Sequence, residues 1–199
     1  TALGAELRDI PAPPPVCSNP EAGIRHTDPA CFASTSLCGY VAVEWASDIR
    51  HRRSVSGIAF LLAGTVVAYK TRVQPTVSTL SNEAEFIATS DAAKMALYIR
   101  TILDELHVPQ QHATLIYEDS TAALNMANAS QPAKRTRDMN IRHFAIQEWV
   151  ENDLIQLKRV DTTVNLSDTL TKPLQRNLFY RHLDALDALM GRHRPYYVG

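Results

Sequence analysis

The chain has 199 residues, of which 45% are hydrophobic and 21% are charged. This length and composition exclude a chain that is disordered throughout, and they predict one domain with appendages. The formal net charge of -1 excludes an overall polycation, so any binding of nucleic acid must use local basic clusters. Two such clusters occur, at 50–53 and 134–137, and solvated loop charge explains each of them equally well.

The three cysteines, Cys17, Cys31 and Cys38, lack a CxxC spacing. An odd number in this arrangement predicts neither a zinc site nor a closed disulfide framework, and it favours a reducing, intracellular compartment, cytoplasmic or nuclear. No apolar run approaches the roughly 18 residues that cross a membrane, so no membrane partner is expected.

Residues 1–37 are predicted to be a Pro-rich and polar leader or linker, because IPAPPP at 10–15 precedes a run dense in Ser, Thr, Asp and Pro. Residues 38–174 follow as the predicted domain, and 175–199 as a carboxy-terminal helix and tail. Short β-rich runs bounded by Gly or polar residues open the domain at 39–45, 57–64 and 65–70. Three consecutive antiparallel strands are the simplest interpretation.

The pattern changes to a helical period over residues 81–106, where apolar side chains recur at steps of three and four. Ser81 or Asn82 is the predicted N-cap. The remaining elements are predicted to be a strand, two helices, a strand and an amphipathic helix, at 113–118, 120–128, 138–151, 154–160 and 176–189. This order indicates an α/β fold with a five-stranded mixed sheet and flanking helices.

Glu85 is the first candidate site residue. It lies three residues before Ala88, on the same apolar stripe of the 81–106 helix, whereas Glu83 points away from that stripe. A carboxylate aimed at the core is costly unless it is paired, hydrogen-bonded or bound to a metal. The alternative is a glutamate favoured at a helix start by the helix dipole, and that explanation has similar weight.

Asp119 and Asp168 are the second and third candidates. Asp119 ends the fourth predicted strand, at the edge where open α/β sheets place ligands, and Asp168 follows the fifth. Either one alone is explained as an N-cap. Together with Glu85 they form a set of carboxylates at the ends of different elements, which is the composition that a hard cation such as magnesium requires.

Several motifs together resemble the ribonuclease H (RNase H) region of copia-type retrotransposon reverse transcriptases. The resemblance runs from about residue 24 to about residue 194, and it depends on the order and spacing of the whole set rather than on any one motif. The motifs are HRRSVSG (51–57), QPTVSTLSNEAEFIA (74–88), IYEDSTAAL (116–124), RTR (135–137), IRHFAIQEWV (141–150) and LSDTLTKPL (166–174).

The resemblance implies an RNase H-like fold in which four acids bind two magnesium ions and the RNA strand of an RNA/DNA hybrid is cut. Three of those acids fall on Glu85, Asp119 and Asp168, which become the expected metal ligands for Mg²⁺ or Mn²⁺. The expected partners are an RNA/DNA hybrid or another nucleic acid, the reverse transcriptase portion of a polyprotein, or a protein partner.

The chain departs from this family in its first strand. The family usually reads GYSDADWAG, whereas this chain reads GYVAVEWAS at 39–47, so the first catalytic aspartate is replaced by Ala42 and the second acid by Glu44. Glu44 shares a strand face with Ala42 but lies two residues, roughly 6.6 Å, further along. Its extra methylene recovers only part of that gap, so Glu44 is at best a partial substitute. We expect weak metal binding and severely impaired hydrolysis.

Two functions remain open on the sequence alone, together with a weaker third. The first is a hybrid-cutting endonuclease, and the second is a non-catalytic RNase H-fold module, for interaction with nucleic acid or protein. The third is a rearranged site that accepts a different metal or substrate through Glu44. A hybrid needs a basic approach surface. The candidate donors are Arg52, Arg53, Lys134, Arg135 and Arg137, beside Arg50. His143 is better explained as part of a packed helix than as a catalytic group.

Overall fold

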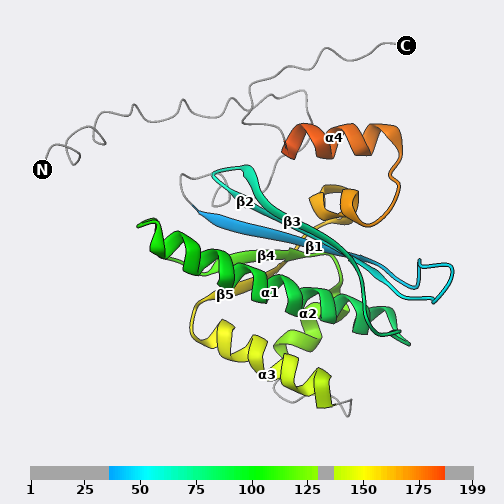
Figure 1. Ribbon diagram of the computed structural model, residues 1–199, viewed down its shortest axis with the longest axis horizontal. Helices are drawn as coiled ribbons and strands as arrows, with labels where there is room; N and C mark the ends of the chain where they lie inside the picture. Colours follow the sequence, from blue (N-terminus) through cyan, green and yellow to red (C-terminus); the bar gives the residue numbers. More distant parts are fainter. Residues whose placement is uncertain (1–35, 130–136, 187–199) are drawn as a thin grey trace, which may run out of the picture.

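A single mixed sheet forms the centre of the molecule. The computed structural model describes residues 36–129 and 137–186, and five strands lie side by side in the order β3-β2-β1-β4-β5 (Figure 1). They are β1 (Leu37–Glu44), β2 (Val55–Leu62), β3 (Thr65–Val73), β4 (Thr114–Glu118) and β5 (Ile155–Arg159). The pairs β1·β2 and β2·β3 are antiparallel, whereas β1·β4 and β4·β5 are parallel. The expected sheet, with its first three strands antiparallel, is confirmed.

Helices cover both faces of this sheet (Figure 1). The long helix α1 packs on one face, where α2 and α3 lie against it. The short 3-10 helix η4 and then α4 cover the other face. The bounds are α1 (Ser81–Glu105), α2 (Thr121–Asn128), α3 (Arg137–Glu151), η3 (Thr162–Val164), η4 (Leu166–Leu170) and α4 (Arg176–Leu186).

The alternation of side chains along β1 separates two hydrophobic clusters. Val41 packs with Ile58, Ile116 and the alanines of α1 on one face. Its neighbour Tyr40 points to the opposite face, where its ring stacks on Tyr117 with centroids 5.0 Å apart. Because successive residues of a strand face opposite ways, one central strand contributes to both layers of the core.

Element boundaries differ from the sequence expectation in a few places. The predicted N-caps of α1, Ser81 and Asn82, are wrong: the helix already begins at Ser81, and the N-cap position belongs to Leu80, whose side chain makes no capping bond. β2 and β3 form a hairpin through Ala63 and Gly64, which have φ angles of 52° and 78°. Such a two-residue turn with positive φ matches the twist of the paired strands, so β2 ends earlier than predicted.

Several expectations fall on residues outside the described ranges. These are almost all of the 1–37 leader, Cys17, Cys31, Lys134 and Arg135. Cys38 is buried on β1. Within the described ranges, no helix is long and apolar enough to cross a membrane.

Candidate functional site

Four acids lie within electrostatic reach of one another at one end of the sheet. Parallel strands end at the same edge, so the carboxyl ends of β1 and β4 meet there, with Val41 paired to Glu118. Asp119 follows β4 directly, and α1 contributes Glu85 from its second turn. Burial raises the pKa of Glu85 to about 8, and the negative charges of Asp119 and Asp168 add to this rise.

The Glu85 carboxylate is held inside the protein without full compensation. Its Oε2 atom is buried and has no hydrogen-bond partner in the described part of the chain. Lys172 is the one cation that opposes the rise of its pKa, and its effect is the smallest of the four causes. The inward direction that the helical pattern predicted for Glu85 therefore agrees with its partly buried place beside other acids.

Asp168 reaches the same region from the opposite face of the sheet. It lies inside η4, its side chain is 2% exposed, and its Oδ2 atom forms an ion pair with Lys172 Nζ at 2.9 Å. Burial raises the pKa of Asp168, the Lys172 ammonium opposes that rise, and the charge of Asp119 adds to it. Asp168 is not the N-cap of η4, because that position belongs to Asn165.

Asn165 fixes η4 to the central strand. Its side-chain amide donates a hydrogen bond to the Val41 carbonyl at 2.8 Å, across 124 residues of sequence. Its Oδ1 atom accepts from the backbone N–H and the hydroxyl of Ser167, at 3.3 and 2.7 Å. Asn165 is fully buried, so these bonds have no competition from water. This amide side chain therefore helps to set the position of Asp168 relative to β1.

Glu118 is a fourth acid that the sequence analysis did not single out. It is completely buried, and its Oε1 and Oε2 atoms accept hydrogen bonds from the Ser120 N–H and the Thr89 hydroxyl, both at 3.0 Å. Burial raises its pKa well above the usual value, and the charge of Glu85 adds to this. The alternation of side chains along β4 could have identified Glu118 from the sequence, because Thr114, Ile116 and Glu118 all point to the face that α1 covers.

Position 42 faces η4, the element that carries Asp168. Ala42 is 1% exposed and pairs with Gly57 across β1 and β2. A side chain added at Gly57 would come within 2.8 Å of the Ser167 carbonyl oxygen, so η4 lies directly on this strand pair. Because its side chain is a methyl group, Ala42 adds no carboxylate to the candidate site. Glu44 ends β1, partly exposed, on the same strand face.

The acids suit a hard cation chemically but do not form a ready binding site. Carboxylate oxygens are the ligands that magnesium prefers, and the unpartnered Glu85 oxygen is a group that a cation would satisfy. Within residues 36–129 and 137–186, however, no three His, Cys, Asp or Glu side chains are arranged to hold a metal ion. Lys172 also occupies one oxygen of Asp168.

The basic candidates are placed separately. Arg52 is exposed and Arg53 half-buried in the loop between β1 and β2, which follows the acidic end of β1. Arg137 is exposed at the first position of α3. His143 is 3% exposed, with its ring 5.6 Å from that of Phe144 and 6.4 Å from that of Phe86, as expected for a packed helix.

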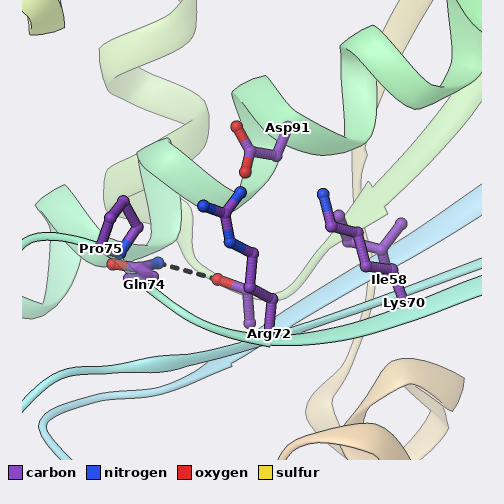
Figure 2. A pocket seen from close by; sticks show the side chains of 7 residues that line it. Ile58, Lys70, Arg72, Gln74, Pro75 and Asp91 are labelled. Atoms are coloured by element: carbon purple, nitrogen blue, oxygen red, sulfur yellow. Dashed lines mark hydrogen bonds between the residues drawn. The ribbon is translucent and has the colours of Figure 1, made fainter.

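A small hollow on the other flank of α1 is separate from the acids. Figure 2 shows Arg72 of β3 and Asp91 of α1 pointing toward each other across it. Gln74, which also lines it, donates a hydrogen bond to Ser56 Oγ at 2.8 Å. Asp91 is already paired with Arg142 of α3 at 2.9 Å. The hollow is lined by Ser56, Ile58, Lys70, Arg72, Gln74, Pro75 and Asp91. None of the four acids lines it, so it is not the candidate site.

The chain is similar to known proteins both in sequence and in fold. The chain is 29% identical, over 168 residues, to the retrovirus-related Pol polyprotein from transposon TNT 1-94 of Nicotiana tabacum, which covers 83% of this chain. It is 27% identical over 144 residues to that of transposon RE2 of Arabidopsis thaliana, which covers 72%. A solved structure of LC11-RNase H1 in complex with an RNA/DNA hybrid matches 68% of this chain and 94% of its own, with a TM-score of 0.51 at 12% identity.

The chain is an RNase H-like domain related to the Pol polyproteins of copia-type retrotransposons. No protein-family model matches it. The RNase H-like domain spans only about a tenth of the length of these relatives, 12% of the first and 10% of the second. The likeness to LC11-RNase H1 confirms the expected fold, and the homology to the Pol polyproteins confirms the expected copia-type origin.

Proposed function

We propose that this RNase H-like domain binds RNA/DNA hybrids at the acidic end of its sheet and that its hydrolysis of the RNA strand is severely impaired. Glu85, Asp119 and Asp168 take the places of three catalytic acids, and Glu44 is a partial substitute for the fourth. Arg52, Arg53 and Arg137 contribute to a basic approach surface, as do Lys134 and Arg135 from the sequence between α2 and α3.

One observation carries the proposal. The charges of Asp119 and Asp168 both raise the pKa of Glu85, and the charge of Asp119 also raises that of Asp168, while the buried position that faces η4 on the central strand is an alanine. Mutual repulsion of this kind is costly to the fold, and it is a common property of sites that act on charged ligands. The alanine leaves β1 without a carboxylate at the position that faces η4, the element that carries Asp168.

The expected defect is large. Glu85, Asp119 and Asp168 would hold the metal ions, which would supply water activation and stabilisation of the leaving oxygen. A missing carboxylate at position 42 should then cost at least about 4 kcal/mol in the transition state, roughly a thousandfold in rate. The Ala42→Asp variant should recover measurable cleavage, since the three other acids remain in place. The new carboxylate points toward η4, which Asn165 holds against β1.

The test is cleavage of a labelled RNA/DNA hybrid in Mg²⁺ and in Mn²⁺, with the parent, Ala42→Asp and Ala42→Asp/Glu85→Gln compared. The parent should be nearly inert, the single variant active, and the double variant inert again. A parent that cuts rapidly would show that Glu44 supplies the missing carboxylate, and Glu44→Ala would then abolish activity. If neither the parent nor Ala42→Asp cuts or binds the hybrid while both fold, the non-catalytic protein-interaction module replaces this proposal.

Metal binding offers an independent check. Because the acids present do not form a ready site and Lys172 neutralises Asp168, we expect Mg²⁺ to bind the parent with millimolar or weaker affinity. Titration calorimetry should show tighter binding for Ala42→Asp than for the parent. Submillimolar binding by the parent would contradict the proposed cause of its inactivity.

A further inference from the structure

An exposed tryptophan follows the acidic end of β1. Trp45 comes directly after Glu44, and half of its side chain, 50%, is exposed to solvent. Its indole N–H nevertheless donates a hydrogen bond to the Ser78 carbonyl at 3.2 Å. Ser78 lies three residues before the start of α1, the helix that carries Glu85. The indole ring is therefore held in one orientation while much of its surface remains open.

The segment that holds the ring is itself anchored to the core. Gln74 is 2% exposed, and its side-chain amide donates to Ser56 Oγ and to the Ala84 carbonyl, both at 2.8 Å. Its backbone N–H donates to the Ser54 carbonyl at 2.8 Å, and its Oε1 atom accepts from the Ser78 hydroxyl at 3.5 Å. These bonds tie the residues before α1 to β2 and to α1. The framework of the fold, rather than a bound molecule, fixes the tryptophan.

Apolar exposure extends beyond this one residue. Val77 and Leu80, on either side of Ser78 in the chain, are 55% and 52% exposed, and Ile49 in the loop after Trp45 is 89% exposed. Single exposed apolar residues are ordinary, but several large ones in the two segments that hold a fixed aromatic ring are typical of a binding surface. Packing within the described residues does not explain why these side chains are held toward solvent.

The loop after the tryptophan carries three arginines, Arg50, Arg52 and Arg53. Its one acid, Asp48, pairs with His51, and Glu44 precedes the tryptophan. The loop after it folds back on itself, since the Asp48 N–H donates to the Arg53 carbonyl at 3.0 Å and the Arg52 N–H donates to the Asp48 carbonyl at 2.7 Å. The Ala46 N–H donates to Ser54 Oγ at 3.1 Å, which returns the arginines to the side of Trp45. No ion pair with another described residue holds Arg50 or Arg52, so both guanidinium groups are available for phosphates.

We infer that Trp45 and the arginine loop 50–53 form the surface that holds the hybrid duplex next to the acids. The indole packs against sugars in the wide, shallow minor groove of an A-form-like duplex, and the arginines bind its phosphates. The combination of a fixed ring with uncommitted cations favours nucleic acid over an apolar protein partner. This inference rests on the proposed function and names the contacts through which its substrate is bound.

The test reads the tryptophan directly, in EDTA so that no cleavage occurs. The protein has two tryptophans, and Trp149 is partly buried in the core, so Trp149→Phe leaves Trp45 as the reporter. We expect an RNA/DNA hybrid to change Trp45 fluorescence and to shield it from iodide. Affinity for a dye-labelled hybrid is measured in parallel by anisotropy.

Three variants complete the experiment. Trp45→Ala should weaken hybrid binding roughly tenfold, whereas Trp45→Phe should lose less than about threefold because it keeps an aromatic face. Tyr98→Ala is the matched control, since this aromatic side chain on α1 is 68% exposed far from the acids in sequence, and its affinity should stay within about twofold of the parent. Thermal melting confirms that each variant is folded.

The outcomes separate the inference from the proposed function. If the hybrid binds the parent but neither Trp45 fluorescence nor the Trp45→Ala affinity changes, the surface is elsewhere and the proposed function survives. If the hybrid does not bind at all, both fail, and the apolar group around Trp45 belongs to a protein partner instead. A fluorescence change with single-stranded DNA but not with the hybrid would overturn the assignment to a duplex.

Discussion

At the level of single residues, the acids of this domain are stabilised in different ways, since Lys172 pairs with Asp168 whereas a hydroxyl and a backbone N–H hold Glu118. Glu118 illustrates the point. The Thr89 hydroxyl lies 3.0 Å from Glu118 Oε2 and 2.9 Å from the Glu85 carbonyl, yet it has one hydrogen to donate. If that hydrogen bonds the carbonyl, Glu118 must itself carry a proton to complete the contact. The geometry therefore favours a neutral Glu118, in the same direction as the effect of burial on its pKa.

Glu85 should make the stability of the protein depend on pH. Its pKa is about 8 in the folded state against 4.5 in the reference state, so the folded protein binds the extra proton. Stability from this group is complete below about pH 4.5 and is lost as pH rises toward about 8. Glu85→Gln should remove part of that slope, leaving the variant more stable than the parent at pH 8 by roughly 1 to 3 kcal/mol.

Urea denaturation at pH 5 and pH 8 measures this difference. Glu83→Gln is the control, because Glu83 lies on the same first turns of α1 but outside the group of acids that raise the pKa of Glu85. Equal slopes for the parent and Glu85→Gln would mean that Glu85 is ionised in the folded protein, and the proposed crowding of charges would then be wrong.

Sequence patterns located three of the four acids but not their surroundings. The helical period gave the inward direction of Glu85, because a 25-residue amphipathic helix has a well-defined apolar side. The alternation along β4 gives the inward direction of Glu118, but its hydrogen bond to Thr89 could not be read from the sequence because Thr89 belongs to a different element. Trp45 was likewise missed, because its fixed orientation comes from a carbonyl 33 residues away.

At the level of secondary-structure elements, a buried amide ties η4 to the central strand, alongside the packing of η4 on Gly57 and the bond from the Thr71 hydroxyl to the Leu170 carbonyl. Asn165→Ala removes the donor to the Val41 carbonyl and the acceptor of the two Ser167 bonds. Buried polar groups left without partners are costly, so we expect a loss of roughly 2 to 3 kcal/mol in the free energy of unfolding. Asn152→Ala, which removes an exposed bond to the Glu148 carbonyl, should cost less than about 0.5 kcal/mol.

Chemical denaturation of both variants checks this expectation. Similar small losses for the two would show that η4 is held by the packing of Ser167 and Leu170 on Gly57 rather than by Asn165. In the Ala42→Asp background, Asn165→Ala should also lower hybrid cleavage, because the Asp168 carboxylate would no longer keep its place beside β1.

The strands and helices were predictable because each has a strong local period, whereas their ends were not. Ser81 was predicted as a cap, yet it is already helical, because the carbonyl of Leu80 begins the helix by accepting from the N–H groups of Glu83 and Ala84. The connection at 160–175 contains two 3-10 helices, and no hydrophobic period in the sequence predicts them. Short turns of this kind depend on capping side chains such as Asp161 and Asn165.

At the level of the whole molecule, the architecture was accessible from the sequence through the order of its elements and the family resemblance. The strand order was not. The placement of β1 between β2 and β4 requires the parallel pairing of Cys38–Val41 with Leu115–Glu118, which joins segments separated by all of α1. That pairing is also what brings the end of β1 to Asp119 and so creates the candidate site.

The charge distribution of the whole domain predicts weak and strongly salt-dependent binding of the hybrid. With a net charge of -1, no long-range field attracts a polyanion, so affinity must come from a few local arginines. If about three phosphate contacts are made, raising salt from about 50 to 200 mM would weaken binding roughly 40-fold.

Arg52→Gln should reduce the slope of log affinity against log salt by about one, and Arg137→Gln should do the same if α3 also contacts the duplex. Anisotropy of a labelled hybrid at four salt concentrations measures the slopes. An affinity that does not change with salt would exclude the arginines as phosphate ligands and would leave apolar contact, centred on Trp45, as the main source of binding.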